Sequence, residues 1–442
     1  MTKHYRIIFE AYDKKPSGET QDNIILEGEV CAPSSCLDFG IRHEEQMRLI
    51  SNVQDRILAL QAGEVGFTDE RCPKCSHGLL KKHGFSTSWF YDVFSDHRVT
   101  LPRRRCNKCN HVVSNTVHSL LGHSLSGELI KIQSEIGAQY SYRDSENLIN
   151  LFSHNKRRIN NHEKIHATTE QVGESLSTLH KIEEEILVAE SADELIINVD
   201  GGHVSSTEED HPSFEAMAAV VYHPAALMSN GKNTRNTITS KHCASSAMAD
   251  SQEQMKRRTI IAALKQGMTP KTKITALCDG ADNCWNIIDA FEPMVVSIDR
   301  ILDWFHLSMK IQNISLPEGL KQKLIHIKWH LWRGNSERAL KRLDTLIPLC
   351  SGVSAERLQK LKTYITNNAA KIINYRERQK NGLPFTSNLA ESTVESLINQ
   401  RCKGQQHMRW SREGLDPILQ IRAAIASNDW DQNWRTAVAS IQ

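Results

Sequence analysis

The chain of 442 residues is longer than one ordinary domain, and its hydrophobic content of 39% is enough for more than one core. It has no apolar run of membrane-spanning length and its first residues do not resemble a signal peptide, so we expect a cytoplasmic protein with no membrane partner. The 54 Lys and Arg residues nearly balance the 52 Asp and Glu residues, which leaves a net charge of +2. Total charge therefore does not indicate nucleic-acid binding, and only local clusters of basic residues could do so.

Residues 1–65 are expected to form an N-terminal β-hairpin followed by a helix. The pattern predicts strands over 5–12 and 23–30 and a helix over 38–61. No chemistry is indicated there, and a role in dimerisation or in packing remains open.

Residues 66–120 are predicted to form a zinc ribbon. The chain has 11 cysteines, and seven of them are scattered singly, which favours a reducing compartment over a disulfide framework. The other four form two Cys-x-x-Cys pairs about thirty residues apart, a spacing typical of tetrahedral zinc sites. Because four thiolates complete the coordination shell, we expect a structural Zn²⁺ bound by Cys72, Cys75, Cys106 and Cys109.

The same segment carries basic residues with aromatic residues between them. This pattern is typical of a surface that contacts the phosphate backbone of DNA, and a solvated charged face is the alternative. The aromatic residues are Trp89, Phe90 and Tyr91, and the basic residues are Lys81, Lys82, Arg103, Arg104, Arg105 and Lys108.

Residues 121–175 have the outline of a helix-turn-helix DNA-binding domain. A serine cap opens an amphipathic helix over 141–152, and the basic segment 156–166 is expected to be the recognition helix, although any helical hairpin with a basic second arm has this pattern. The expected DNA contacts are Lys156, Arg157, Arg158 and Lys164. An acidic linker helix over 176–194 follows, and it includes Glu183, Glu184 and Glu185.

Strands and helices alternate over residues 195–306. Three successive strands, followed by helix, strand, helix and strand, predict a mixed sheet with helices packed on it. The strands are expected near 195–200, 215–223, 236–243, 272–278 and 294–299, and the helices over 251–267 and 282–291.

Two of these strands lead to an aspartate followed by glycine. One apolar run begins at Leu195 and ends at Asp200, and a second ends at Asp279. An isolated Asp-Gly pair is most often a turn, but a carboxylate at the end of a buried strand also suits a bound cation, and the repeat favours that interpretation. The two carboxylates meet if the two strands are adjacent.

The rest of the chain is expected to be mainly helical. In residues 307–386, Lys, Arg and Trp are interleaved, and the Trp residues suit either a core or base stacking. In residues 387–442, a helix starting near Asn388 carries Glu391 and Glu395 one turn apart, so either could face the aspartates. Three carboxylates without a Ser-His-Asp arrangement suit a pair of hard divalent cations that clamp a phosphodiester.

The order of Asp200, Asp279 and Glu391 and the closing Met408-Arg-Trp-Ser run resemble the DDE transposases of bacterial insertion sequences, in particular the ISKra-type group. An arginine follows the glutamate by ten residues in that group, and Arg401 keeps the spacing, so the resemblance favours Glu391 over Glu395. Asp303 and His306 resemble an Asp-x-x-His signature of related families, with a helix cap as the alternative for Asp303. The departure is Thr386-Ser-Asn where the group often has Gly-Ser-Gly.

The resemblance implies a multidomain α/β protein. An RNase H-like mixed sheet with a helical insertion would follow the zinc ribbon and the helix-turn-helix, and Asp200, Asp279 and Glu391 would bind two Mg²⁺ or Mn²⁺ ions, supported by Asp303, His306 and Arg401. It also implies a transposase that binds the inverted-repeat ends of its element as a homo-oligomer on double-stranded DNA and catalyses strand cleavage and strand transfer. A catalytically silent DNA-binding regulator and a structure-selective nuclease of the same fold remain alternatives.

Overall fold

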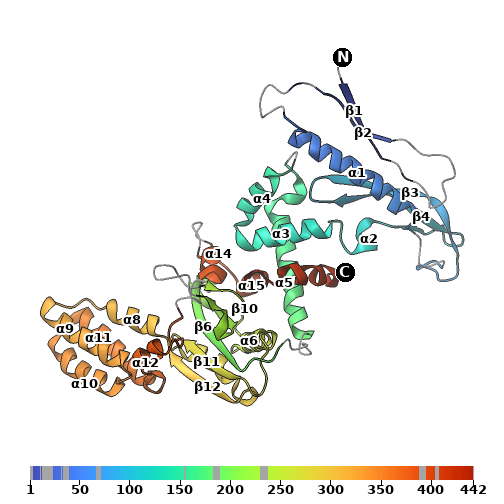
Figure 1. The fold of residues 1–442 in the computed structure, drawn as a ribbon. Coiled ribbons are helices and arrows are strands. Elements are labelled where there is room, and N and C mark those ends of the chain that lie inside the picture. Colours follow the sequence, from blue (N-terminus) through green and yellow to red (C-terminus); the bar gives the residue numbers. More distant parts are fainter. Residues whose placement is uncertain are drawn as a thin grey trace. The chain divides into compact units, whose positions relative to one another are not determined.

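The computed structural model describes residues 3–9, 11, 23–30, 32, 39–65, 71–153, 156–182, 190–228, 237–387, 395–403 and 408–441 (Figure 1). The chain divides into an N-terminal unit of residues 1–169 with 438–442 and a second unit of residues 170–437. None of the helices in the described ranges has the length and apolar character that a bilayer crossing requires.

The N-terminal unit begins with the predicted hairpin and helix. β1 (Lys3–Phe9) pairs antiparallel with β2 (Asn23–Val30), and α1 (His43–Gly63) follows. Residues 39–42, which were expected to be helical, are not. The helix begins after Arg42 because the Glu45 carboxylate accepts a hydrogen bond from the Arg42 amide and closes the first turn there.

A long hairpin lies at the centre of this unit. β3 (Leu80–Tyr91) pairs antiparallel with β4 (Asp96–Cys106), and the short β5 (Val112–Ser114) pairs with β4. Alternate residues of β4 are buried, as expected for a strand with one covered face. α1 and the short α2 (Val117–Leu121) contribute to the core there, which contains Ala62, Val99, Leu101 and Val117.

His97 of β4 ties α1 to this hairpin. Its side chain is 1% exposed, and its Nδ1 lies 2.7 Å from a carboxylate oxygen of Asp55 in α1, while Nε2 lies 3.1 Å from Asp92. Burial alone would lower the pKa of His97, but the hydrogen bonds to Asp92 and Asp55 outweigh burial and raise it. The folded unit therefore binds this proton more tightly than the unfolded chain does.

Replacing His97 with glutamine should destabilise the protein more at pH 6 than at pH 9. A raised pKa contributes stability below the ordinary value of about 6.5, and this contribution is lost as the pH rises through the folded value. The loss at pH 6 should be about 1.5–3 kcal/mol, as for a hydrogen bond to a charged group. Urea unfolding followed through hydrogen exchange of the β4 amides measures it. His118→Gln, at an exposed histidine of α2, is the control, and equal losses at both pH values would contradict the prediction.

The helices that follow correct the predicted helix-turn-helix. α3 (Gly127–Gln139) and α4 (Tyr142–Leu151) are followed by a 3-10 turn at Arg158–Asn160, and α5 (His162–Ile182) begins only then. The predicted recognition helix over 156–166 is therefore wrong. Asn161 is extended, and its side chain accepts a hydrogen bond from the Lys164 amide, so it caps α5 and separates that helix from the preceding segment. Glu183, Glu184 and Glu185 of the predicted linker lie outside the described residues.

The second unit is built on a mixed sheet, as the sequence predicts. Its strands lie in the order β10-β7-β6-β11-β12; β7 is antiparallel to both β10 and β6, and β11 is parallel to both β6 and β12. The strands are β6 (Glu194–Ser205), β7 (Ser213–Tyr222), β10 (His242–Ser246), β11 (Lys273–Cys278) and β12 (Ser297–Leu302).

β6 continues to Ser205, five residues beyond its predicted end, and two other strands differ from the prediction in position. The segment predicted as a strand over 236–243 instead contains β9 (Thr237–Ile238), which pairs with β8 (Leu227–Met228) outside the large sheet, and β10 begins only at His242. The strand predicted over 294–299 is displaced because a 3-10 turn at Glu292–Met294, with Pro293 in its first turn, precedes it.

Helices cover both faces of this sheet. α6 (Glu253–Lys265) and α7 (Asp282–Asp289) pack on the face that contributes Leu195, Ile197 and Val199 to the core. α15 (Arg412–Ala426) covers the other face at β10, where the Ser245 hydroxyl donates to the Leu419 carbonyl. Beyond the β10 edge, Arg258 of α6 and Asp416 of α15 form a buried bidentate ion pair with two 2.8 Å hydrogen bonds.

After β12 the chain forms a helical bundle, which is the orange group in Figure 1. Two tyrosines join it to the sheet, because the Tyr375 hydroxyl donates to the Leu302 carbonyl at 2.8 Å and the Tyr364 hydroxyl donates to the Asp279 carbonyl. The bundle consists of α8 (Trp304–Gln312), α9 (Glu318–Trp332), α10 (Ser336–Leu346), α11 (Gly352–Asn367) and α12 (Tyr375–Lys380). A π-helical turn (Glu395–Asn399), α14 (Gln400–Cys402), α15 and α16 (Trp430–Ser440) complete the described chain.

Candidate functional site

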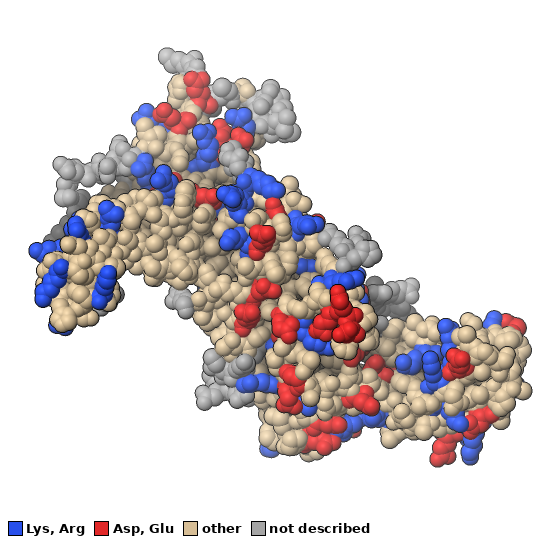
Figure 2. Space-filling model, turned by 180° about the vertical axis from the view of Figure 1, so that it is seen from behind, with Lys and Arg blue, Asp and Glu red and all other residues tan. Residues whose placement is uncertain are grey.

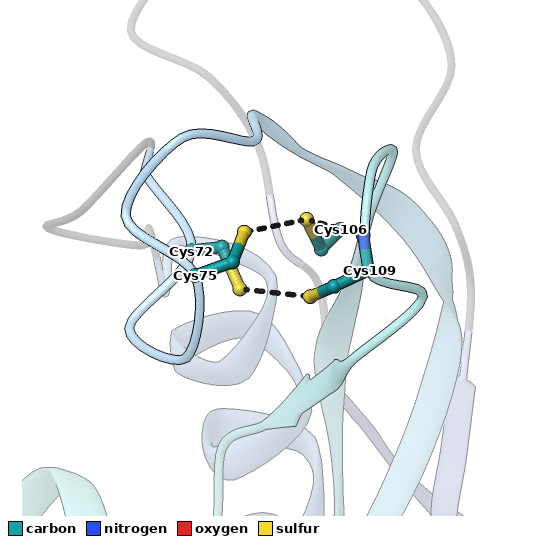
Figure 3. Close-up of side chains that lie close together, drawn as sticks. All are labelled: Cys72, Cys75, Cys106 and Cys109. Carbon is teal, nitrogen blue, oxygen red and sulfur yellow. Dashed lines mark hydrogen bonds between the residues drawn. The ribbon is translucent and has the colours of Figure 1, made fainter.

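The four predicted zinc ligands come together beside the β3–β4 hairpin (Figure 3). The sulfur atoms of Cys72 and Cys109 are 3.6 Å apart, those of Cys75 and Cys106 are 3.7 Å apart, and all four lie within 4.8 Å of one another. Tetrahedral coordination with Zn–S bonds of about 2.3 Å requires sulfur separations of about 3.8 Å. The predicted cysteine cluster is confirmed, and it could hold a structural Zn²⁺.

Both cysteine pairs lie on tight turns of similar geometry. Ser76 and Asn110, which follow the second cysteine of each pair, have left-handed backbones with φ of 55° and 58°. The backbone amides of Cys109 and Lys108 point to the sulfur of Cys106 and lower its pKa to about 6. Because the thiolate is the form that binds metal, these amides favour cation binding at Cys106. At Cys109, by contrast, a backbone hydrogen bond from His111 is outweighed by the neighbouring thiols, which raise the pKa of Cys109 to about 11.

The parallel strands deliver aspartates at one level of the sheet. Val199 pairs with Cys278, and Cys278 pairs with Leu302. The next residue along each segment is an aspartate, so Asp200, Asp279 and Asp303 follow one another across β6, β11 and β12; we call them the aspartate row. Because Val199 and Cys278 belong to the core beneath α6 and α7, the alternation along a strand directs Asp200 and Asp279 to the opposite face.

Asp200 and Asp279 are the partly exposed members of the row. One oxygen of Asp200 accepts a hydrogen bond from the Gly201 amide at 2.8 Å, and one oxygen of Asp279 accepts from the Ala281 amide at 2.9 Å. Burial raises the pKa of Asp200, and the carboxylates of Asp279 and Asp303 add to the increase. A cation bound between Asp200 and Asp279 would relieve this repulsion.

Asp303 is fully buried and its two oxygens are already engaged. They accept hydrogen bonds from the amides of Phe305 and His306, which cap α8, and from the amide and hydroxyl of Ser387. Burial alone would raise the pKa of Asp303, but hydrogen bonds from His306 and Ser387 outweigh it and hold the pKa below its ordinary value. Asp303 is therefore the N-cap of α8, as the alternative interpretation of the sequence expected. Its carboxylate also orients the His306 ring.

His306 links Asp303 to the rest of the row. Its Nδ1 lies 2.7 Å from Asp303, and its Nε2 lies 4.0 Å from a carboxylate oxygen of Asp200. Burial alone would lower the pKa of His306, but the hydrogen bond to Asp303, together with the charges of Asp200 and Asp279, raises it. A partly exposed imidazole whose protonated form is favoured by these carboxylates thus lies beside Asp200.

The two glycines after Asp200 accommodate the protein's own side chains. A Cβ on Gly201 would lie 2.2 Å from a Glu215 carboxylate oxygen, and one on Gly202 would lie 3.1 Å from the Ile398 side chain and 3.3 Å from Asn399 Oδ1. Because Gly202 and Asp200 are on the same face of β6, the segment 395–399 packs two residues beyond Asp200 on that face.

The predicted third carboxylate, Glu391, lies outside the described residues. In the described part of the chain, the four cysteines are the one group of three or more His, Cys, Asp or Glu side chains whose ligand atoms all lie within 4.8 Å of one another. Asp200 and Asp279 therefore need a further ligand to form a complete metal site. Glu395, the alternative, accepts a hydrogen bond from the Asn399 side chain.

Arg401 has a packing role. It is 2% exposed, its guanidinium lies 4.9 Å from the centre of the Trp410 ring, and it donates to the sulfur of Met408. The Trp410 amide in turn donates to the Ser205 carbonyl at the end of β6. Arg401 thereby supports the segment that packs against β6.

Basic residues face one another across the β3–β4 hairpin. Lys81 lies opposite Arg105 and Lys82 opposite Arg104, and like charges in opposite positions destabilise a hairpin unless an anion is bound. The part of the N-terminal unit formed by β3 and β4, at the left of Figure 2, carries Lys and Arg side chains with few Asp or Glu side chains among them. Lys108 is also exposed, whereas the Arg103 Nε donates to the His83 carbonyl.

A cleft of about 600 Å³ lies beside this hairpin within the N-terminal unit. Aromatic and basic side chains line it together, including Trp89, Tyr91, Phe94, Lys156, Arg158 and Lys164. The expected DNA contact of Arg157 is wrong, because its buried guanidinium donates to Asp96 and to the carbonyls of Asp92, Val93 and Ser95. Arg157 anchors the segment to the hairpin turn, and Lys156 forms a 2.9 Å ion pair with Glu146.

Sequence reasoning missed Tyr364 and Asn368, which hold the Asp279 turn. The Tyr364 hydroxyl donates to the Asp279 carbonyl, and the Asn368 side chain donates to the Gly280 carbonyl at 3.4 Å. Burial raises the pKa of Tyr364, which keeps the hydroxyl protonated as a donor. Both residues lie far along the chain in or beside α11, and no local signal connects them with Asp279.

Neither the family models nor the curated proteins with which the chain was compared gave a match. The fold and the site therefore define the protein by class. It is a mixed α/β protein with a cysteine cluster that could bind zinc and a carboxylate and imidazole site at one level of three parallel strands.

Proposed function

We propose that this protein is a DDE-type transposase with an RNase H-like catalytic core. The observation that carries the proposal is the aspartate row, in which Asp200 and Asp279 occupy equivalent positions beside adjacent parallel strands and His306 is directed toward Asp200. The strand order also supports it, because β10-β7-β6-β11-β12 places the two aspartate-bearing strands side by side within the sheet.

In the proposed reaction, Asp200 and Asp279 bind divalent cations together with Glu391, whose part rests on the resemblance alone. Bound Mg²⁺ or Mn²⁺ would polarise the phosphodiester and favour ionisation of the attacking oxygen. Water attacks phosphorus as the bond to the 3′ oxygen breaks, and that oxygen leaves as the 3′ hydroxyl. This hydroxyl then attacks target DNA in the same way. The His306 imidazolium, oriented by Asp303, places a positive charge beside the phosphate and can donate a proton there.

The N-terminal unit is the proposed DNA-binding part. The like-charged pairs across β3 and β4 and the aromatic and basic cleft at Arg158 and Lys164 suit a phosphate backbone. Its proposed ligand is the inverted-repeat end of the protein's own element, bound as double-stranded DNA by a homo-oligomer.

A cleavage assay with three DNA substrates tests the proposal. The full chain with Mg²⁺ is offered a duplex of the DNA that flanks its reading frame, where the proposal expects a short inverted repeat, a duplex with that sequence scrambled, and a branched duplex of the same length. A transposase should cut the first substrate at the element boundary and leave the other two largely intact. Equal cutting of the branched duplex would identify a structure-selective nuclease, and binding without cleavage would identify a regulator.

A further inference from the structure

α9 of the helical bundle has a second patterned face besides its buried one. Leu324, Ile327 and Leu331 point into the bundle and are buried. The positions 326, 329, 330 and 333 recur at helical spacing on another side of the helix, so their side chains are neighbours. They are His326, Trp329, His330 and Arg333.

These side chains form one wall of a cleft of about 510 Å³ in the second unit. Arg342 of α10, Arg376 of α12 and Trp332 complete the lining. The lining residues are thus three arginines, two histidines and two tryptophans. The size lies within the range of about 300–1,000 Å³ that is typical of ligand pockets.

The charge of this cleft is uncompensated within the described structure. No ion pair to Arg333, Arg342 or Arg376 is present among the described residues. Burial lowers the pKa of His330, and the positive charges of Arg342, Arg338, Arg333 and His326 lower it further. Gathered guanidinium groups repel one another, and a bound anion would remove that repulsion.

The two tryptophans in the lining have different surroundings. The Trp332 ring is held by other aromatic rings, with centroids 4.7 Å from Trp304 and 5.4 Å from Phe385. Trp329, by contrast, is 51% exposed beside the arginines. Trp332 is held in place by its aromatic neighbours, and the exposed Trp329 ring can stack on a ligand. An aromatic ring beside guanidinium groups suits a ligand that combines a planar base with a phosphate group.

We propose that this cleft binds single-stranded DNA, with an unpaired base stacked on Trp329 and backbone phosphates at Arg333, Arg342 and Arg376. An unpaired strand is favoured over a duplex because base pairing and stacking hide the base faces that an exposed indole would contact. The choice of DNA over RNA rests on the proposed function, whereas the site itself is separate from the aspartate row.

Binding of a fluorescent fifteen-residue oligo(dT) to the full chain, measured by anisotropy without divalent cations, tests the proposal. Trp329→Ala should weaken binding at least about fivefold, while Trp329→Phe should retain most of the affinity, because loss of a stacked base costs about 1–3 kcal/mol. Arg342→Gln should weaken binding and reduce the slope of log affinity against log salt by about 0.7. Lys341→Gln, the same charge change at the neighbouring exposed residue, should leave binding unchanged.

A second measurement locates the oligonucleotide, since the N-terminal unit also carries basic residues. A strand with 5-bromodeoxyuridine should crosslink to the α9 peptide that contains Trp329. Crosslinks confined to other peptides would overturn the proposal, as would Trp329→Ala or Arg342→Gln proteins that bind like the Lys341→Gln protein. Equal affinity for oligo(U) would overturn the choice of DNA, and a duplex that loses as much affinity as the single strand on Trp329→Ala would overturn stacking of an unpaired base. Because no cleavage is measured, failure here leaves the proposed transposase activity standing, and loss of that activity leaves this test unaffected.

Discussion

Replacing Asp279 with asparagine should reduce Mg²⁺-dependent cleavage of end-sequence DNA by roughly 10³-fold or more. The asparagine removes one negative ligand from the proposed metal site, and a bound metal ion is worth several kcal/mol in the transition state, where each 1.36 kcal/mol is tenfold in rate. The fold should survive because the asparagine side-chain oxygen can still accept the hydrogen bond from the Ala281 amide. Single-turnover cleavage of a labelled end duplex measures the effect, and anisotropy of the same duplex should show unchanged binding.

Asp282→Asn is the matched control, because it makes the same charge change three residues later at the exposed start of α7. That variant should cleave within a few-fold of the wild-type rate. If the Asp279→Asn protein cleaves as fast as the Asp282→Asn protein, Asp279 is not part of the active site. A calorimetric titration with Mn²⁺ adds a readout that does not depend on DNA, and it should show weaker binding only for Asp279→Asn.

Replacing Cys106 with serine should abolish stoichiometric zinc binding and unfold the end of the β3–β4 hairpin. Structural zinc sites contribute about 10–16 kcal/mol of binding free energy, which is comparable with the roughly 5–15 kcal/mol that stabilises a whole domain. Cys106 is 1% exposed, and Gly78 has no room for a side chain because its Cβ would lie 2.3 Å from the Cys106 sulfur. Zinc released by thiol modification and a thermal unfolding curve measure the two effects.

Cys350→Ser provides the control for loss of a thiol, since Cys350 is a partly buried cysteine beside α11 and outside the cluster. It should retain one zinc ion per chain and the wild-type unfolding curve. A Cys106→Ser protein that still binds one zinc ion per chain with unchanged stability would refute the four-thiolate site. Wild-type protein treated with a chelator should behave like the Cys106→Ser protein and recover when zinc is returned.

The sequence predicted those parts of the molecule that depend on local patterns. The cysteine cluster follows from the spacing of two turns, and the positions of Asp200 and Asp279 follow from apolar runs that end at the same level of adjacent strands. Ile301 and Leu302 also lead to an aspartate, Asp303, in register with the other two. The predicted strand ended at residue 299, so Asp303 was not expected to lie beside Asp200 and Asp279. Pro293 was the signal for the delayed strand start.

The missed features depend on contacts between distant segments. Residues 156–166 have a plausible helical pattern, yet the hydrogen bonds of Arg157 to the hairpin turn and the Asn161 cap hold its first part out of the helix. The close approach of Glu215 to Gly201 depends on the register of β6 and β7, which places Glu215 opposite His203. Single-residue patterns carry no information about such pairings.

Asp200, Asp279 and Asp303 lie side by side because the strands before them are in register. The number of residues in each strand therefore decides whether the three carboxylates meet. Asp200 and Asp279 face away from α6 and α7 because an uninterrupted pleat precedes each of them. One extra residue within β11 would turn the carboxylate of Asp279 toward the hydrophobic core, even though every side chain of the site was still encoded. Insertions in surface loops leave this level unchanged, whereas the three parallel strands must keep their residue count.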